Sequence, residues 1–303
     1  MGHPAPSAVG SWRELGRVFS ASTTPSVRIA AVGNTFGPSE LRVAELIAAE
    51  PDAVVEWTAQ ELADRAGVGR ATVVRTCQSL GYRGYPQLRV ALAAELGQSE
   101  TPVDHGPGVL GRMRKEIDRV AASLPALTSL LDGESVAEAV RLAASSRRLL
   151  VLANGLSSPI ASDLAMRLTA SGRPAEFIAD AIAQQIAARH LGAEDVCLII
   201  SGSGANEATL RVAVAAARGG AKVIAVTSFA ASALTERATL SLVITPSGVS
   251  FRDELEHASR VAYLVFAEIF ADAVTAERGV DARKARARAM EVVSDNLGEN
   301  AGE

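Results

Sequence analysis

The sequence predicts an all-α domain followed by an α/β domain that is built on a parallel sheet. Residues 36–97 show helical periodicity, interrupted by a short glycine turn. From residue 149 onward, five short apolar runs alternate with helical stretches that are rich in alanine. Strands that alternate with helices form parallel sheets with helices on both faces. A chain of 303 residues also accommodates two domains of roughly 100–200 residues each.

The composition excludes several classes of protein. With 48% hydrophobic and 21% charged residues, the chain carries enough apolar surface to fold, which excludes a wholly disordered protein. No apolar run reaches the roughly 18–20 residues that span a bilayer. Residues 1–12 lack the basic start and apolar stretch of a signal peptide, so we expect a cytoplasmic protein. Two distant cysteines, Cys77 and Cys197, predict neither a disulfide nor a metal framework.

Local composition divides the chain into five segments. Residues 1–35 are rich in Ser, Thr, Pro and Gly, and we predict a mobile N-terminal arm in which a short helix could form near residues 12–19. Residues 36–97 form the helical domain, and residues 98–108, with two prolines and two glycines, form a linker. We assign residues 109–278 to the second domain, including its leading helices and a long apolar helix at about 252–277 that closes it, and residues 279–303 to a charged, helical tail.

Three helices in succession organise the first domain. Pro38 and Glu40 open the first of them, because proline suits the first helical position and an acid favours the positive helix end. Residues 58–61, TAQE, form a capping box that begins the next helix. Glycines in the turn at 67–69 can take left-handed backbone angles, and a further helix follows at 70–81.

The helix at 70–81 has the layout of a recognition helix in a DNA-reading helix-turn-helix. Its apolar residues recur at helical spacing on one side, which leaves polar residues for the other side. An arginine on that side can bind a guanine in a bidentate way. The alternative is a helical bundle whose arginine face is only solvated. Together with the arginine that follows the helix, the DNA-binding candidates are Arg70, Thr72, Arg75, Thr76 and Arg83.

The charges of the first domain are segregated. A net charge of −4 argues against a protein that coats nucleic acid along its whole surface, but it allows one local basic face. Residues 36–97 contain six arginines and eight acidic residues, whereas residues 65–94 hold five of these arginines and no acid. The acids therefore lie away from the predicted DNA face.

The stretches ELADRAGVGRATVVR and LGYRGYPQLR resemble the N-terminal domain of RpiR-type transcriptional regulators, and the resemblance covers residues 37–97. It implies a regulator that binds double-stranded operator DNA. Members of this family usually carry Ser where this chain has Gly69, so a phosphate contact through a hydroxyl at this position is not implied.

Two loops of the second domain suit an anion. Serines and glycines follow the first and third apolar runs, between the carboxyl end of a strand and the N-terminus of a helix. Free backbone N–H groups and the helix dipole attract an anion there, and ligands of open parallel sheets bind at this edge. The alternative is a set of ordinary turns with capping serines. Neither loop has a dinucleotide or NTPase fingerprint.

We predict strands at 149–153, 175–178 (a weak run), 195–200, 222–227 and 240–245. The anion-binding candidates are Asn154, Gly155, Ser157, Ser158, Ser201, Gly202, Ser203, Gly204 and Asn206, with Ser232 from a third loop.

The loop SGSG, the strand KVIAVT with the serine at 232, and the segment HASRVAYLVFAEIF resemble the SIS (sugar isomerase) domain, which binds phosphorylated sugars. The likeness covers about residues 135–278. It implies a five-stranded parallel sheet in flavodoxin-like order and dimerisation through helices. In the family pattern, Ser157, Ser201 and Ser203 match phosphate-binding hydroxyls.

This chain departs from the SIS pattern at two positions. Asn206 replaces the threonine that usually follows the SxSG motif, although asparagine can still cap the helix that follows, and Thr239 replaces the acid that usually precedes the last strand. The resemblance therefore does not imply a particular sugar.

Two functions from different classes remain open. The first is a regulator, dimeric or tetrameric, that senses a phosphorylated sugar without converting it and needs no cofactor or metal. The alternative is a sugar-phosphate isomerase with an appended helical domain, which needs a Glu or His base. Glu254 and His257 lie three residues apart, although a solvated helix start is the preferred interpretation, and His190 more simply interacts with a helix end. A scaffold dimer that does not bind DNA fits the segregated arginines less well.

Overall fold

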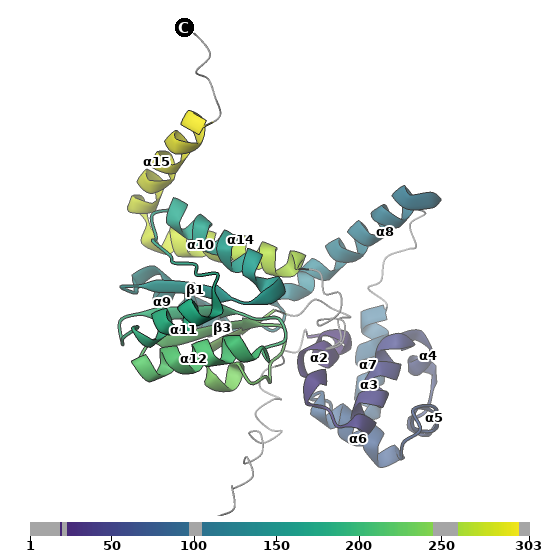
Figure 1. The fold of residues 1–303 in the computed structure, drawn as a ribbon. Coiled ribbons are helices and arrows are strands. Elements are labelled where there is room, and N and C mark those ends of the chain that lie inside the picture. Colours follow the sequence, from purple (N-terminus) through teal and green to yellow (C-terminus); the bar gives the residue numbers. More distant parts are fainter. Residues whose placement is uncertain (1–18, 20–22, 97–104, 245–259, 297–303) are drawn as a thin grey trace, which may run out of the picture. The chain divides into compact units, whose positions relative to one another are not determined.

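The computed structural model describes residues 19, 23–96, 105–244 and 260–296, and they fall into two compact units (Figure 1). The boundary along the chain lies between Leu130 and Leu131. The predicted order of an all-α part followed by an α/β part is confirmed. Each unit is described by itself.

The first unit is entirely helical among its described residues. Prolines at the first helical positions begin three of its helices, α2, α3 and α4, where the missing N–H group costs no hydrogen bond. The predicted capping box of α5 is present, with Thr58 Oγ1 accepting from Glu61 N at 3.2 Å. The helices are α2 (Pro25–Val32), α3 (Pro38–Ala49), α4 (Pro51–Glu56), α5 (Ala59–Arg65), α6 (Arg70–Ser79), α7 (Tyr85–Leu96) and α8 (Gly108–Ser123). Two short 3-10 helices, η1 (Gly33–Thr35) and η2 (Leu124–Thr128), follow α2 and α8.

The prediction of a mobile arm over residues 1–35 is wrong for its last part. Residues 25–35 form α2 and η1, and the α2 side chains of Val27, Ala30 and Ala31 are buried. The helix escapes a periodicity analysis because it has only eight residues and one of its buried side chains is an arginine. Residues 1–18 and 20–22, which include most of the helix considered at 12–19, lie outside the described residues.

Arg28 joins α2 to the C-terminal end of α6, the predicted recognition helix. Its guanidinium donates to Thr23 O at 2.9 Å and to Leu80 O at 3.0 Å, and it stacks between the rings of Phe19 and Tyr82. Burial lowers the pKa of Arg28, and the backbone carbonyls compensate part of this desolvation. The N-terminal helix therefore stabilises the position of α6.

Helix α8 belongs to the first unit in the structure, whereas the sequence analysis groups it with the second domain. Of its sixteen residues only Gly111 is buried, so its own pattern does not reveal where it belongs. The 3-10 helix η2 that follows it is tied to the first unit by Thr23 Oγ1, which donates to Ser129 O at 3.1 Å.

The second unit is a parallel sheet of four strands with helices on both faces (Figure 1). The strands β1 (Leu149–Ala153), β2 (Val196–Ile200), β3 (Lys222–Thr227) and β4 (Leu240–Val243) are neighbours in this order. One face is covered by α9 (Gly133–Ser145), α10 (Ser158–Ala170) and α14 (Val261–Arg278). The other face is covered by α11 (Ala181–Arg189) and α12 (Glu207–Gly219).

The expected fifth strand, residues 175–178, is reduced to a single bridge. Glu176 N donates to Leu149 O and Val151 N donates to Glu176 O, both at 2.9 Å, so the segment does lie beside β1 as a flavodoxin-like order requires. The ladder does not extend because Pro174 has no N–H group to donate, and because Asp180 already caps α11. Four strands, not five, are therefore present in the described part of the chain.

The remaining elements agree with simple expectations from the sequence. The predicted closing helix at about 252–277 appears as α14, with residues 252–259 outside the described range, and α15 (Val280–Asn296) follows it. None of the described helices is long and apolar enough to cross a membrane. Both cysteines are unpaired and buried, and burial raises the pKa of each thiol to about 12.

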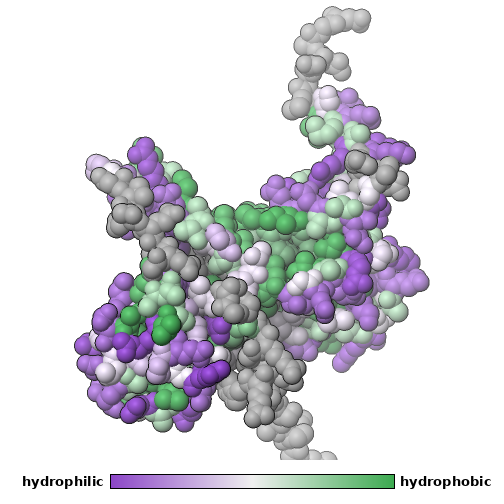
Figure 2. Space-filling model, turned by 180° about the vertical axis from the view of Figure 1, so that it is seen from behind, coloured by the Kyte–Doolittle hydropathy of each residue, from purple (hydrophilic) through white to green (hydrophobic). Residues whose placement is uncertain are grey.

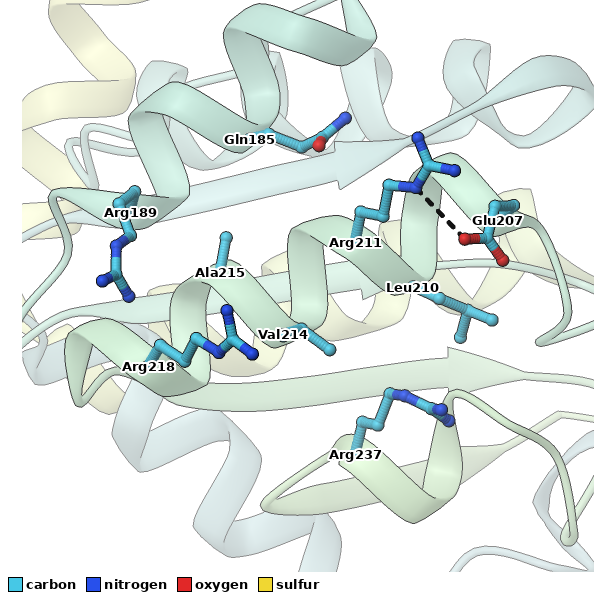
Figure 3. Close-up of a pocket in the computed structure, with 9 residues that line it drawn as sticks. All are labelled: Gln185, Arg189, Glu207, Leu210, Arg211, Val214, Ala215, Arg218 and Arg237. Carbon is cyan, nitrogen blue, oxygen red and sulfur yellow. Dashed lines mark hydrogen bonds and ion pairs between the residues drawn. The ribbon is translucent and has the colours of Figure 1, made fainter. Parts of the chain in front are cut away.

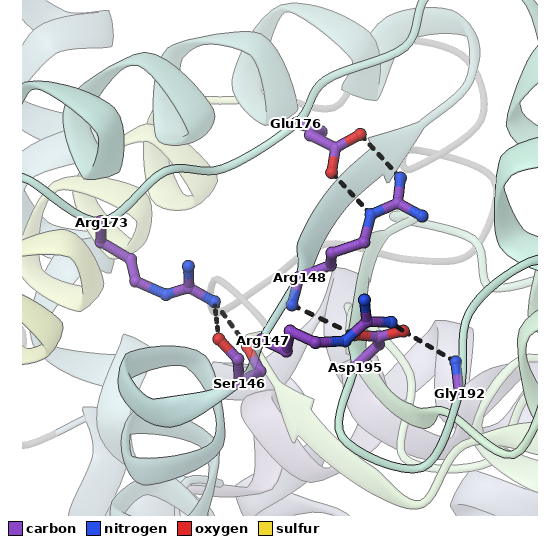
Figure 4. A network of polar contacts seen from close by, with 7 residues as sticks. All are labelled: Ser146, Arg147, Arg148, Arg173, Glu176, Gly192 and Asp195. Atoms are coloured by element: carbon purple, nitrogen blue, oxygen red, sulfur yellow. Dashed lines mark hydrogen bonds and ion pairs between the residues drawn. The ribbon is translucent and has the colours of Figure 1, made fainter.

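A buried carboxylate connects the amino ends of β1 and β2 (Figure 4). The Asp195 side chain is fully buried and accepts from Gly192 N at 2.8 Å, Arg147 Nη2 at 2.7 Å and Arg148 N at 3.2 Å. Burial by itself would raise the pKa of Asp195, but the hydrogen bonds from Gly192 and Arg147 and the charge of Arg147 lower it overall. Its negative form is thus favoured in the folded state.

We predict that Asp195→Asn lowers the free energy of unfolding by roughly 1–3 kcal/mol at pH 7, because buried donors lose a charged acceptor. A lowered folded-state pKa contributes stability above the unfolded pKa of about 3.9, and this contribution is lost as pH falls through the folded value. The difference between wild type and variant should therefore shrink below about pH 4, as measured by chemical denaturation. Asp272→Asn, which removes an exposed ion pair with Arg286, is the control and should cost at most about 1 kcal/mol. An equal loss in both variants would contradict the prediction.

Candidate functional site

Three loops meet at the carboxyl edge of the sheet because the strands end at the same level. Ala153 pairs with Ile200, and Ile200 pairs with Val226 in the parallel ladders. The residues that follow these positions therefore emerge side by side. This places the loops at 154–158, 201–206 and 227–232 along one edge of the second unit, as the sequence predicts.

The first loop leaves one hydroxyl available. Ser157 is buried to 5% exposure, and its hydroxyl makes no hydrogen bond with another described residue. Ser158 Oγ is already used, since it donates to Ala153 O at 3.2 Å and closes the turn at the start of α10. Gly155 is exposed and has a φ of 60°. Of the two predicted serines, Ser157 is thus the better donor for a ligand.

The second loop lies at the start of α12. Ser201 is also buried, and its hydroxyl has no partner among the described residues. The Ser203 hydroxyl accepts from Ala205 N at 3.3 Å and can still donate its own hydrogen. Gly202 O accepts from both Thr227 Oγ1 and Ser228 N at 3.0 Å, which fixes this loop to the third one.

Gly204 must be a glycine for two reasons. Its φ of 60° lies in the left-handed region, and a Cβ atom at this position would collide with the Oγ of Ser232. Ser232 Oγ in turn accepts from Thr235 N at 3.2 Å. The predicted site residues Gly204 and Ser232 therefore belong to one packed arrangement.

A chain of side-chain hydrogen bonds holds the first and second loops together. Asn206 Oδ1 accepts from Thr209 N at 3.0 Å and thereby caps α12, as expected from the sequence. The Asn154 Nδ2 group donates to Thr209 Oγ1 and to Gln184 Oε1, both at 3.0 Å. Asn154 thus positions the loops and uses both of its Nδ2 hydrogens within the protein.

Sequence analysis missed Gln184 and Thr209, which complete this chain. Gln184 is fully buried, and its Nε2 group donates to Ala153 O at 3.0 Å and to Ile178 O at 2.7 Å. Both side chains lie in alanine-rich helices, where a single polar residue on the inner face was the only available signal.

Chemically, this edge offers neutral hydrogen-bond donors beside two helix N-termini. Ser157, Ser201 and Ser203 lie on the loops that lead into α10 and α12, and the free N–H groups at these helix starts favour an anion. Neutral donors of this kind suit the phosphate group of a molecule whose remaining part is uncharged.

In the first unit, α5, the turn at 66–69 and α6 have the predicted helix-turn-helix order. Gly67 has a φ of 63°, whereas Gly69 is in extended conformation, with a φ of −81° and a ψ of 151°, as the N-cap of α6. Arg70 and Arg75 are exposed on α6, and Arg83 is exposed just after it. The side chain of Arg75 donates to Thr72 Oγ1 at 3.1 Å.

Two of the five DNA-binding candidates do not lie on the exposed side of α6. Thr76 is fully buried and its hydroxyl donates to Thr72 O at 2.9 Å, while Thr72 is only 7% exposed. The assignment of Thr76 to the DNA face is therefore wrong, and Thr72 can act only through Arg75. The error arose because α3 packs against α6 on a second side, which a helical pattern does not reveal.

The other arginines of the basic stretch are used inside the unit. Arg65 stacks on the ring of Trp57 at 4.1 Å, and Arg89 donates to Val55 O at 2.8 Å. Arg42, which the sequence analysis did not select, donates to Ala66 O at 3.1 Å and thereby holds the turn before α6. Charge segregation alone therefore overstates the number of free arginines.

The candidate base His190 lies at the wrong edge of the sheet. It follows α11 and precedes β2, whereas the serine loops follow the strands, so the length of a five-residue strand lies between them. Glu254 and His257 lie outside the described residues.

The two units define a class of protein: a helix-turn-helix domain joined to an α/β domain with serine loops at its carboxyl edge. Family models agree with this division. Residues 26–99 match the helix-turn-helix domain of the rpiR family, and residues 142–251 match the SIS domain. The chain belongs to the rpiR family of helix-turn-helix regulators, since it is also 30% identical over 249 residues to the HTH-type transcriptional regulator HexR of Pseudomonas aeruginosa. That match covers 80% of this chain and 86% of HexR.

Other relatives are longer or more distant. The chain is 31% identical over 280 residues to the bifunctional protein glk of Paraburkholderia xenovorans, and the match covers 90% of this chain. It spans only 43% of the length of that relative. Among solved structures, the Vibrio vulnificus NanR protein complexed with ManNAc-6P has a TM-score of 0.56 and 24% sequence identity. It covers 89% of this chain and 98% of NanR, which shows a common fold.

We predict that Gly204→Ala destabilises the second unit by roughly 2–5 kcal/mol, because the cost of a strained backbone and the cost of a collision with Ser232 add. Gly155→Ala is the matched control: it has the same φ of 60°, but its added Cβ meets nothing within 4 Å. This control should cost only about 1–2 kcal/mol, and thermal unfolding of both variants measures the difference. Equal losses would show that the contact with Ser232 is unimportant.

Proposed function

We propose that this protein is a DNA-binding transcriptional regulator whose second domain senses a phosphorylated sugar without converting it. One observation carries the proposal. The hydroxyls of Ser157 and Ser201, at the aligned ends of β1 and β2, form no hydrogen bond with any other described residue, and the chain also carries an exposed arginine pair on a recognition helix. Access to DNA also implies that the protein acts in the cytoplasm.

The DNA-binding part of the proposal rests on α6. Arg70 stands at its first turn, which is the end of a recognition helix that enters the major groove. Arg75 is held by Thr72 in one orientation, and Arg83 extends the exposed basic surface beyond the helix. Family membership and the regulator HexR support the same conclusion.

The sensing part rests on the serine loops. Neutral donors and helix N-termini suit a phosphate, and the related NanR protein has been solved as a complex with ManNAc-6P. We infer a phosphorylated sugar as the ligand class. Among the candidate bases, His190 lies at the opposite edge of the sheet, which favours sensing over isomerisation.

We further propose that the protein acts as a homodimer or homotetramer. Helix α8 exposes four large apolar side chains, Val109, Leu110, Met113 and Ile117, each by more than half. The surface of α14 is also apolar, with Leu264 and Ile269 exposed by 42% and 62%, and Figure 2 shows hydrophobic colour over this helix. Exposed apolar surface of this extent marks an interface with another chain. A dimer would read two half-sites about 34–36 Å apart, or a multiple of this distance.

We predict that replacing Arg70 and Arg75 together by Ala abolishes specific operator binding without unfolding the first unit. Losing an arginine that reads a base should cost roughly 1–3 kcal/mol of binding free energy. Losing an arginine that contacts a phosphate should instead reduce the steepness with which log K falls against log salt concentration by about one. Mobility shifts and footprints on the operator, at several salt concentrations, measure both effects. Arg141→Ala, in the second unit, is the control and should leave binding unchanged. A folded double variant with normal operator affinity would overturn the assignment.

We predict that Ser201→Ala or Ser203→Ala binds operator normally but responds only to higher concentrations of the sugar phosphate. Losing one donor to a charged phosphate should cost roughly 1.5–3 kcal/mol of ligand binding. Coupling is reciprocal: operator DNA must change the affinity for the sugar phosphate by the same factor by which the sugar phosphate changes the affinity for DNA. The coupling free energy is typically about 1–3 kcal/mol. Paired titrations test this, with Ser162→Ala on the exposed side of α10 as control. Steady conversion of the sugar, detected by NMR, would replace sensing by the enzyme alternative.

A further inference from the structure

A groove on the second unit begins at Glu207, next to the second serine loop, and runs from there along α11 and α12; the proposed function does not use it. It runs between α11, α12 and the short 3-10 helix η4 (Thr235–Arg237), and its volume is about 450 Å³ (Figure 3). Nine residues line it: Gln185, Arg189, Glu207, Leu210, Arg211, Val214, Ala215, Arg218 and Arg237.

The groove is strongly basic. Four of its nine lining residues are arginines, and one is an acid. Arg211 is paired with Glu207 at 3.1 Å, and Arg237 lies 3.8 Å from Glu236. The side chains of Arg189 and Arg218, in contrast, form no ion pair or hydrogen bond with any residue that the structure describes. Two positive charges therefore remain to be met by an occupant.

The floor and one rim of the groove are apolar. Leu210 and Val214 lie one turn apart on α12 and line the groove together with Ala215. On α11, Ile182 and Ile186 do not line the groove itself, but they are 68% and 59% exposed in the same stretch of helix as Gln185 and Arg189. Burying these apolar side chains against an apolar helix face would lower the free energy of the complex, whereas the phosphate backbone of a nucleic acid offers them no apolar contact.

The spacing of the charges suits a third helix. Arg211 and Arg218 are seven residues apart on α12, which places them two turns and about 10.5 Å apart along the helix axis. A helix that lies along the groove presents residues seven apart at the same spacing and on one face. One carboxylate of this helix could thus meet Arg218 and another could compete with Glu207 for Arg211, while its apolar side chains cover Leu210 and Val214.

We propose that this groove docks an acidic amphipathic helix of a partner protein. The helix carries Asp or Glu residues seven apart, with apolar residues between them on the same face. A second copy of this chain is a poorer occupant, because a symmetric contact through the groove would bring identical arginines together.

The test uses the full-length protein and two fluorescent helical peptides of identical length. The acidic peptide carries Glu at positions seven apart with leucines between them, and the basic peptide has Lys in place of each Glu. We expect anisotropy titrations to show binding of the acidic peptide alone, weakened by salt. Replacing Arg189 and Arg218 together by Ala should weaken this binding at least about tenfold.

A matched control removes the same number of charges elsewhere: Arg141→Ala with Arg167→Ala, on α9 and α10, should bind the acidic peptide like the wild type. Three results would overturn the proposal. The acidic peptide fails to bind, or it binds the Arg189/Arg218 variant as tightly as the wild type. Alternatively, that variant loses affinity for non-specific duplex DNA, or changes its oligomeric state, which would assign the groove to nucleic acid or to a second copy.

Discussion

The parallel ladder of β1, β2 and β3 is the constraint on which the ligand site depends. Because Ala153, Ile200 and Val226 pair at one level, three loops that are distant in sequence must leave the sheet together. The hydrogen bonds of Asn154 to Thr209 and Gln184 then fix two of these loops against each other. Because these other polar groups hold the loops, the hydroxyls of Ser157 and Ser201 are not needed for hydrogen bonds within the described part of the chain.

Arginine has two distinct roles in this protein, and burial separates them. Arg28 and Arg173 are buried, burial lowers the pKa of each, and both donate to backbone carbonyls at helix ends or loops. Arg70, Arg75 and Arg218 stand exposed on helices and keep their charge for a partner. The buried group stabilises the fold, and the exposed group determines which surfaces attract an acidic molecule or DNA.

One hydrogen bond offers a physical link between the ligand edge and the proposed subunit interface. Ser228, in the third loop, shares a hydrogen bond of 2.8 Å with the hydroxyl of Tyr263 on α14. The outer side of the same helix carries Leu264 and Ile269, which are exposed and apolar. A ligand that displaces the third loop therefore acts on the helix through which we propose that the subunits associate. Such a helix is a suitable two-state element for coupling the sensor to DNA.

The sequence by itself determined the order of the two domains, four of the strands, the caps at Thr58 and Asn206, and the serine loops, because each depends on local spacing or on residues next to a strand end. Tertiary structure alone decided the rest. The segment around Glu176 became a single bridge because Pro174 and Asp180 limit it on both sides, and α2 became ordered because Arg28 found carbonyls and rings far along the chain. Thr76 does not lie on the DNA face because α3 packs against that side of α6. Asn154, a predicted ligand-binding residue, instead supports the loops because it donates to Gln184 and Thr209. In each case the deciding partner is distant in sequence, so that no local pattern contains it.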